Sequence, residues 1–329
     1  MAATGEQGRA RQAWGDAIVT VTEAGAPLDF YFPDPRLGPP TGPGRLPPAP
    51  DREDPLRAVR VTRQRVEVAD LDAPPRDAGD AYLRLHLLSH RLARPNSVNL
   101  DGIFGVLPTV CWTSAGPVDA AGAGAFLARA RAAGQVVQVR LADKFPPMLD
   151  YVVPAGVRVA DASRVRLGAY LGEGTVIMHE GFVNYNAGTL GACMVEGRIS
   201  QGVVVGAGTD VGGGAAIMGT LSGGGKERIT VGERCLLGSN SGLGISLGDD
   251  CVVEAGLYLT AGTVVTLADG QRVKARELSG QPGLMFIRHS VTGRVEARPR
   301  TGAWGTLNAQ LHAAGQTAAG QTVAGQPAP

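Results

Sequence analysis

The sequence predicts a mainly β protein in which a parallel β-helix follows a small α+β domain. Three observations favour this fold class: the 329-residue chain contains 48 glycines, only 5% of its residues are aromatic, and its middle part repeats every six residues. So much glycine without the triplet spacing of collagen indicates many tight turns or close backbone contacts. A period of six matches neither a helix nor the plain alternation of a strand, so it indicates stacked repeats.

The first expected domain, residues 1–154, combines strands and helices. Residues 16–32 alternate apolar and polar positions on both sides of a Gly-Ala-Pro break, as a β-hairpin would, and residues 56–71 resume this alternation. The segment 32–55 between these stretches is dense in proline and glycine. We therefore expect it to be an irregular linker.

A helix is expected over residues 79–93, where apolar residues recur at helical spacing and Asp80 is a suitable N-cap. His86 and His90 lie four residues apart on it, the spacing of a metal-binding pair. The sequence between them lacks the acidic residue of the H-E-x-x-H motif, and no third ligand is in sight, so we interpret both as structural. The four cysteines form no C-x-x-C pair and are expected to be small buried hydrophobic residues.

The six-residue repeat predicts the β-helix over residues 155–285. When residues 159–200 are set in rows of six, an aliphatic residue opens six of the seven rows, and the pattern resumes from Val205, Val231 and Leu247. Three rows make one triangular coil, in which the aliphatic side chains point inward and glycine or asparagine turns each corner. Successive coils then stack through parallel hydrogen bonds.

Three segments fall outside the repeat. Residues 218–230 are rich in glycine and then charged, so they are expected to project as a lid or as a loop that spans two subunits. Residues 286–307 form a C-terminal extension of the β-helix. Residues 308–329 are of low complexity and almost uncharged, and are expected to be disordered.

Charge and hydropathy exclude several partners. The formal net charge is only +1, with basic and acidic residues mixed along the chain, so neither nucleic acid nor an anionic membrane is expected to bind. No signal peptide is recognisable, and no apolar run reaches the roughly 18 residues that a membrane span needs. A cytoplasmic protein is expected.

Five long strings carry a resemblance to a known family over residues 80–295. They are DAYLRLHLLSHRL, DKFPPMLDYVVPAGVR, MHEGFVNYNAGTLGACMVEGRIS, DVGGGAAIMGTLSGGG and NSGLGISLGDDCVVEAGLY. The chain resembles the tetrahydrodipicolinate N-succinyltransferases, in the form found in actinobacteria and their relatives. The resemblance implies a left-handed parallel β-helix, a hand that the period alone does not set, and a homotrimer with active sites in the grooves between subunits. It also implies transfer of a succinyl group from succinyl-CoA to the amino group of ring-opened tetrahydrodipicolinate, on the succinylase route to diaminopimelate and lysine, without a cofactor.

The resemblance also implies roles for individual residues. Glu196, a lone carboxylate among small residues, matches the family's catalytic glutamate. Its role is either that of a general base or that of an acyl-anhydride intermediate. General-base catalysis is the more economical, because an amine attacking a thioester needs proton removal but no covalent relay. The Gly219 N–H is the matching oxyanion donor, and Arg198 suits a carboxylate of the succinyl group or the acceptor. Further contacts with CoA carry over to Gly213, Ser239, Glu254, Ala255, Gly262, Lys274, Ile287, Arg288, His289 and Ser290, among which Lys274 and Arg288 suit phosphates.

Two positions depart from the family pattern. Ala216 stands where related enzymes have a serine, which removes one hydroxyl contact with the donor. For a magnesium ion on the trimer axis the pattern supplies an aspartate and a glutamate; Glu180 remains, but Ser163 replaces the aspartate. Three symmetry-related glutamates are then the remaining carboxylate ligands.

Three other functions are compatible with a six-residue repeat as such. An acetyl-CoA-dependent N-acetyltransferase would keep the same fold, and donor choice would distinguish it. A noncatalytic β-helix scaffold would fail to bind CoA. A γ-class carbonic anhydrase is excluded, because it needs three histidines and the repeat region before residue 285 contains only His179.

Overall fold

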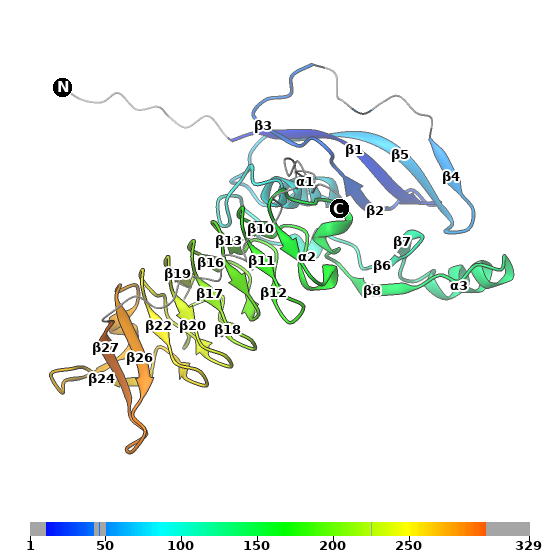
Figure 1. The fold of residues 1–329 in the computed structure, drawn as a ribbon. Coiled ribbons are helices and arrows are strands. Elements are labelled where there is room, and N and C mark those ends of the chain that lie inside the picture. Colours follow the sequence, from blue (N-terminus) through cyan, green and yellow to red (C-terminus); the bar gives the residue numbers. More distant parts are fainter. Residues whose placement is uncertain (1–10, 43–45, 47–50, 225, 301–329) are drawn as a thin grey trace, which may run out of the picture.

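The protein, described here by a computed structural model, has an N-terminal sheet with a helix beneath it at one end and a β-helix that extends away from them (Figure 1). The structure describes residues 11–42, 46, 51–224 and 226–300. The tail 308–329 and residues 301–307 of the expected extension lie outside these ranges. Within the described ranges, no helix is long and apolar enough to cross a membrane.

The N-terminal sheet has the strand order β2-β1-β5-β4, and β3 also pairs with β1. Its strands are β1 (Ala13–Thr22), β2 (Pro27–Tyr31), β3 (Arg36–Leu37), β4 (Arg52–Asp54) and β5 (Val59–Val68). The segment 32–55, expected to be irregular, therefore contains two short strands. The reason is tertiary: β1 and β5 present backbone groups that need partners, and a composition rich in proline does not reveal them.

Helix α1 (Ala78–Ser89) packs against this sheet with every residue buried. The expectation that Asp80 caps it is wrong: the N-cap is Asp77, whose carboxylate accepts the N–H of Asp80. Asp80 instead turns inward, where it accepts a hydrogen bond of 2.6 Å from the fully buried Arg84. An aspartate one turn into the helix can thus serve a buried cation instead of the helix end.

A second small sheet, ordered β7-β6-β8, connects α1 to the β-helix. The elements of this region are α2 (Ile103–Val106), β6 (Val110–Thr113), β7 (Gly116–Asp119), α3 (Ala123–Ala132), β8 (Val139–Asp143), η1 (Met148–Asp150) and η2 (Ala162–Arg164). The two regions share one core: the ring of Phe145 stacks on Tyr185 of the β-helix at 4.3 Å. Ser89, at the end of α1, donates to the carbonyl of Ala169 and accepts the N–H of Gly168. The N-terminal region thus closes one end of the β-helix.

The β-helix has three faces of two-residue strands that pair in parallel from coil to coil. The first face contains β9 (Arg158–Val159), β11 (Val176–Ile177), β14 (Met194–Val195), β17 (Asp210–Val211), β20 (Leu236–Leu237) and β22 (Val252–Val253). The second contains β12 (Phe182–Val183), β15 (Arg198–Ile199), β18 (Ala216–Ile217), β21 (Gly242–Leu243) and β23 (Tyr258–Leu259). The third contains β10 (Tyr170–Leu171), β13 (Gly188–Thr189), β16 (Val204–Val205) and β19 (Thr230–Val231).

The interior of the β-helix is filled by the residues that open the six-residue rows. Most of them are the second residue of a strand, while Val165 and Leu247 form isolated bridges, and the successive side chains of Ile177, Val195, Val211 and Leu237 on the first face are fully buried. Where the third face turns into the first, small polar side chains donate hydrogen bonds of 2.9–3.2 Å to a carbonyl of the next coil. These donors are Thr175, Cys193, Thr209, Cys235 and Cys251. All four cysteines are buried and free, and Cys193, Cys235 and Cys251 thus act as weak donors as well as small hydrophobic residues.

The coils end in two hairpins. They are formed by β24 (Val264–Thr266) with β25 (Arg272–Lys274) and by β26 (Leu284–Arg288) with β27 (Val295–Pro299), and η3 (Ala275–Leu278) lies between them. β26 pairs in parallel with β22, so the sheet of the first face continues as β22-β26-β27-β24-β25. The chain leaves the repeat before residue 285 because a turn at Asp269 and Gly270 reverses it, with Gly270 at φ 87°.

Candidate active site

The predicted site residues gather at the corners of the β-helix. The corner between the first and second faces, the first corner, holds Glu196, Gly213, Ser239 and the adjacent pair Glu254 and Ala255 in four successive coils. Their backbones are in close contact from coil to coil, because a Cβ atom added to Gly238 would lie 2.4 Å from the nitrogen of Ala255. These five residues form a continuous column, the first-corner column.

Glu196 directs its carboxylate along this column. It follows β14 at the turn, is half-buried, and places Oε2 3.4 Å from the position that a Cβ on Gly213 would take. Within the part of the chain that the structure describes, the carboxylate has no hydrogen bond and no ion pair. Its oxygens are therefore available to accept a proton from a ligand.

Arg198 lies on β15 and projects from the second face. Its guanidinium carbon is 4.8 Å from the centroid of the Phe182 ring, in the preceding coil, while Glu196 faces Gly213 in the following coil. The side chains of Arg198 and Glu196 therefore face different coils. Strand alternation does not apply to the pair, because β14 ends at Val195 and Glu196 belongs to the corner.

The second face carries small residues between Arg198 and Tyr258. In register, Arg198 is followed by Ala216, Gly242 and Tyr258 in successive coils. A Cβ on Gly242 would lie 2.3 Å from the ring carbons of Tyr258, so a larger residue would displace this exposed ring. Ala216, which lacks the family's hydroxyl, lies in this row.

Gly219 lies at the corner between the second and third faces, the second corner. A Cβ there would lie 2.7 Å from the carbonyl oxygen of Gln201, so a side chain would displace the backbone. Its N–H donates to no acceptor among the described residues, as an oxyanion donor requires. Gly262, after β23, lies at the same corner. In one chain, Gly219 and Gly262 are thus separated from the first-corner column by the second face.

The loop 218–230 leaves the coil at this second corner. Thr220 and Arg228 form an antiparallel bridge within it, and the Arg228 guanidinium donates to the side-chain oxygen of Gln201 at 2.7 Å. The loop is thus fastened to the coil beside Gly219.

The far end of the first-corner column meets the segment Ile287–Ser290. The carboxylate of Glu254 accepts the backbone N–H of Arg288 at 2.6 Å, which fixes the end of β26 to the last coil. Lys274 is exposed on β25, where it pairs with Val264. His289 and Ser290 lie in the turn that follows β26.

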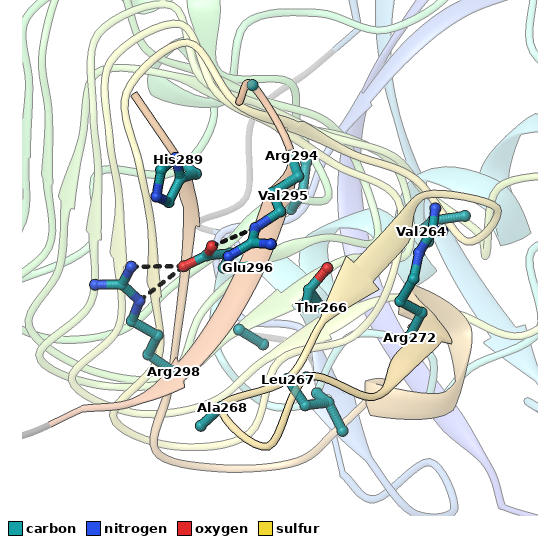
Figure 2. A pocket seen from close by; sticks show the side chains of 13 residues that line it. Val264, Thr266, Leu267, Ala268, Arg272, His289, Arg294, Val295, Glu296 and Arg298 are labelled. Carbon is teal, nitrogen blue, oxygen red and sulfur yellow. Dashed lines mark hydrogen bonds and ion pairs between the residues drawn. The ribbon is translucent and has the colours of Figure 1, made fainter. Parts of the chain in front are cut away.

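A cleft of about 800 Å³ opens beside this segment, between β24, β25 and β27. Figure 2 shows Arg294, Glu296 and Arg298 on one side of it and Arg272 with Val264 on the other. Sequence reasoning missed the three arginines. The alternation in the stretch RVEAR, residues 294–298, was the signal that places Arg294, Glu296 and Arg298 on one face of a strand.

Comparisons with known proteins identify the family. A profile described as the middle part of tetrahydrodipicolinate N-succinyltransferase matches residues 107–146, and one described as the hexapeptide repeat of succinyl-transferase matches residues 228–261. The 2,3,4,5-tetrahydropyridine-2,6-dicarboxylate N-succinyltransferase of Pseudomonas aeruginosa is 58% identical over 247 residues, which cover 74% of this chain and 72% of that protein. The enzyme of the same name from Vibrio cholerae is 56% identical over 246 residues, covering 73% and 71%.

The chain belongs to the tetrahydrodipicolinate N-succinyltransferase family. A solved structure from Campylobacter jejuni, described as a 2,3,4,5-tetrahydropyridine-2-carboxylate N-succinyltransferase, superimposes with a TM-score of 0.76 at 30% identity and covers 90% of this chain and 94% of that one. The prediction of a left-handed hexapeptide-repeat β-helix is confirmed. As a member of the family, the chain is an acyltransferase.

The family pattern also placed magnesium ligands at positions 163 and 180. Ser163 instead donates from both its N–H and its hydroxyl to the carboxylate of Asp161, and this holds the pKa of Asp161 below its usual range. Glu180 is exposed, with one oxygen 3.5 Å from Nε2 of His179. In the described ranges, no three side chains of the metal-binding types come together. One chain thus offers no set of oxygen ligands that fits magnesium.

Proposed function

We propose that the protein transfers the succinyl group of succinyl-CoA to the amino group of ring-opened tetrahydrodipicolinate, in the cytoplasm, without a cofactor. The observation that carries this proposal is the identity of 58% over 247 residues to the enzyme of that name from Pseudomonas aeruginosa. The product would be N-succinyl-2-amino-6-oxopimelate, with free CoA as the second product.

Glu196 is the proposed general base. The amine nitrogen attacks the thioester carbonyl carbon, Glu196 takes the proton that the nitrogen loses, and the carbon–sulfur bond then breaks as that proton passes to the departing thiolate. The half-buried, unpaired carboxylate beside Gly213 supports this role. An acyl-anhydride on Glu196 is the second role that this position allows.

Gly219 is the proposed oxyanion donor. Its N–H has no acceptor among the described residues, and a tetrahedral oxyanion would supply one. Because Gly219 and the first-corner column lie at different corners, we propose that Glu196 of one chain and Gly219 of another complete each site in a homotrimer.

Arg198 is the proposed partner of the donor's terminal carboxylate. It is exposed, it forms no ion pair among the described residues, and the Phe182 ring supports its guanidinium from below. A guanidinium can bind a carboxylate through two hydrogen bonds. Acetyl-CoA has no such carboxylate, so this contact would favour succinyl-CoA.

The deciding experiment is a thiol-release assay with tetrahydrodipicolinate and either succinyl-CoA or acetyl-CoA. We expect acceptor-dependent release with a strong preference for succinyl-CoA, and we expect Arg198→Gln to reduce this preference. A preference for acetyl-CoA would favour an N-acetyltransferase of the same fold, and failure to bind CoA would favour a noncatalytic scaffold.

Complementation tests the shared site. Trimers made only of Glu196→Gln chains or only of Gly219→Ala chains are expected to be inactive. Mixed trimers from co-expression should recover part of the activity, because some of their sites combine Glu196 of one variant chain with Gly219 of the other. No recovery in mixed trimers of normal sedimentation would show that both residues act within one chain.

A further inference from the structure

The cleft at the end of the β-helix has a cationic lining. Arg294 and Arg298 project from β27, and Arg272 projects from β25 across the cleft (Figure 2). Glu296 is the one acidic residue in the lining, so the charged side chains sum to two positive charges with His289 neutral. A concave site of this volume with convergent charges is suited to a small anionic ligand.

Glu296 holds two of these arginines in place. Its side chain is only 8% exposed, and it accepts hydrogen bonds from Nε of Arg294 at 2.7 Å and from Nε of Arg298 at 2.9 Å. These ion pairs keep the pKa of Glu296 below its usual range, so the carboxylate stays charged. Arg294 and Arg298 remain about half exposed, which leaves N–H groups on their outer edges for a ligand.

Arg272 adds a cation that is not neutralised by the protein. It has no hydrogen bond or ion pair with any described residue. It lies on β25 opposite Thr266, whose neighbour on β27 is Glu296. The three arginines thus belong to one continuous sheet surface.

The cleft lies at a distance from Glu196 that an extended CoA molecule can span. The first-corner column rises from Glu196 through Gly213, Ser239 and Glu254 to Arg288, which is four strand spacings of about 4.8 Å, or about 19 Å. His289, the next residue, lines the cleft. A thioester carbon held beside Glu196 therefore leaves the nucleotide end of the donor near the cleft.

We propose that this cleft binds the 3′-phosphate of the CoA nucleotide through Arg294 and Arg298, with Glu296 as a positioning residue for both. The proposal rests on the proposed function, since it takes CoA as the donor. Arginine forks match the geometry of phosphate oxygens, and the fixed orientation of both side chains reduces the entropy lost on binding. The cleft would thereby select free CoA thioesters over donors without a 3′-phosphate.

Calorimetry with CoA and with 3′-dephospho-CoA tests the phosphate site. The wild-type protein should bind CoA about ten- to a hundredfold more tightly, the range expected for one or two charge-assisted hydrogen bonds. The double variant Arg294→Gln, Arg298→Gln should lose this preference and leave the affinity for 3′-dephospho-CoA unchanged. Arg52→Gln, which changes an exposed arginine of the N-terminal sheet, is the matched control and should keep the preference.

Two outcomes overturn the phosphate site. One is equal affinity of the wild-type protein for the two nucleotides, and the other is an unchanged preference in the double variant. Neither depends on succinyl transfer, because binding is measured without acceptor. Failure of the proposed function would appear separately, as absence of thiol release from succinyl-CoA by the wild-type protein.

Glu296→Gln tests the positioning role. Glutamine keeps the size of the side chain but holds both arginines less firmly, so the preference for CoA over 3′-dephospho-CoA should fall and KM for succinyl-CoA should rise while kcat stays the same. A lower melting temperature with an unchanged preference would show that Glu296 serves only the fold.

Discussion

The substitution Glu196→Gln, which replaces one carboxylate oxygen by an amide nitrogen, should change catalysis without changing stability. The carboxylate is not used by the fold, because it forms no hydrogen bond with the described residues. We expect Glu196→Gln to lower kcat by about 10²- to 10⁴-fold, the usual contribution of a general base, and to leave the melting temperature unchanged. Steady-state kinetics and a thermal melt measure both effects.

Glu173→Gln is the matched control for this variant. Glu173 is an exposed glutamate at another corner of the coil, where it packs beside Gly156. Its replacement should not change kcat. Wild-type turnover in Glu196→Gln would exclude both proposed roles of that residue.

His86 predicts a loss of stability in acid. Burial lowers its pKa to about 3, and its ring is held neutral, with Nδ1 donating to the carbonyl of Tyr82 and Nε2 accepting the N–H of Phe32. Because the unfolded chain binds this proton near pH 6.5 and the folded chain only near pH 3, the contribution of His86 to stability is complete above pH 6.5 and falls as the pH drops from 6.5 to 3.

Urea unfolding at pH 7.5 and 4.5 measures this effect. At 1.36 kcal/mol for each pH unit, the wild-type protein should lose about 2 to 3 kcal/mol more between these pH values than His86→Gln does. His90, whose pKa burial also lowers, is present in both proteins and cancels in the comparison. Equal losses would show that His86 is protonated in the folded protein.

Single residues were predictable from the sequence where a motif fixed their position. Glu196 and Ser239 were named from strings shared with the family, but their place in one column comes from the structure, and their roles stay predictions. The capping role of Asp77 was not predictable, because Asp77 and Asp80 both suit an N-cap. Only the tertiary structure shows that Asp80 pairs with Arg84.

At the scale of elements, α1 is held in place by a buried ion pair. Arg84 donates to Asp80 and to the backbone carbonyls of Asp70, Leu71 and Asn99. Arg84→Met would leave Oδ1 of the buried Asp80 without its cationic donor and would remove the side-chain donor to these carbonyls, so we expect a loss of about 3 to 5 kcal/mol in the free energy of unfolding. Thermal and urea melts would measure this loss.

Arg76 provides the matched comparison on the same helix end. It also pairs with Asp80, at 3.3 Å, but its side chain is 63% exposed. Arg76→Gln should therefore cost less than about 1 kcal/mol. A similar cost for the two variants would show that burial does not determine the strength of this network.

The repeated elements were predictable, and the irregular ones were not. Most aliphatic residues that open a row of six became inward strand residues, because period and burial are linked in a stacked coil, whereas Val165 and Leu247 form isolated bridges. The strands β3 and β4 depend on pairing with distant strands, which composition does not record. The β24–β25 hairpin carried a local signal, the Asp269-Gly270 turn, but the six-residue period concealed it.

At the scale of the whole molecule, the proposed site needs more than one chain. The sequence places Glu196 and Gly219 only 23 positions apart, yet the structure puts them at different corners. A six-residue period predicts the coil of one chain, but it does not predict which corners of two neighbouring chains meet at their interface. The shared groove is therefore an expectation that only the family resemblance supplies.

Metal removal tests the axis of the proposed trimer. Since one chain presents Glu180 without the family's aspartate, we expect chelation with EDTA to change the melting temperature by less than about 1 °C, well under the shift that 1 kcal/mol of stabilisation produces. Sedimentation should show the same oligomer with and without chelator. A clear fall in melting temperature would show that three glutamates suffice to bind a cation.

The pairing of β26 with β22 determines when the molecule can be completed during synthesis. Each coil pairs only with its neighbours, and the N-terminal region covers the first coil, so coils can form in the order in which the ribosome releases them. The last coil is different: its first-face edge stays open until residues 284–288 emerge. A nascent chain therefore exposes one unpaired β-edge until late in translation, and a chain truncated before β26 would keep that edge permanently, which makes self-association its expected fate.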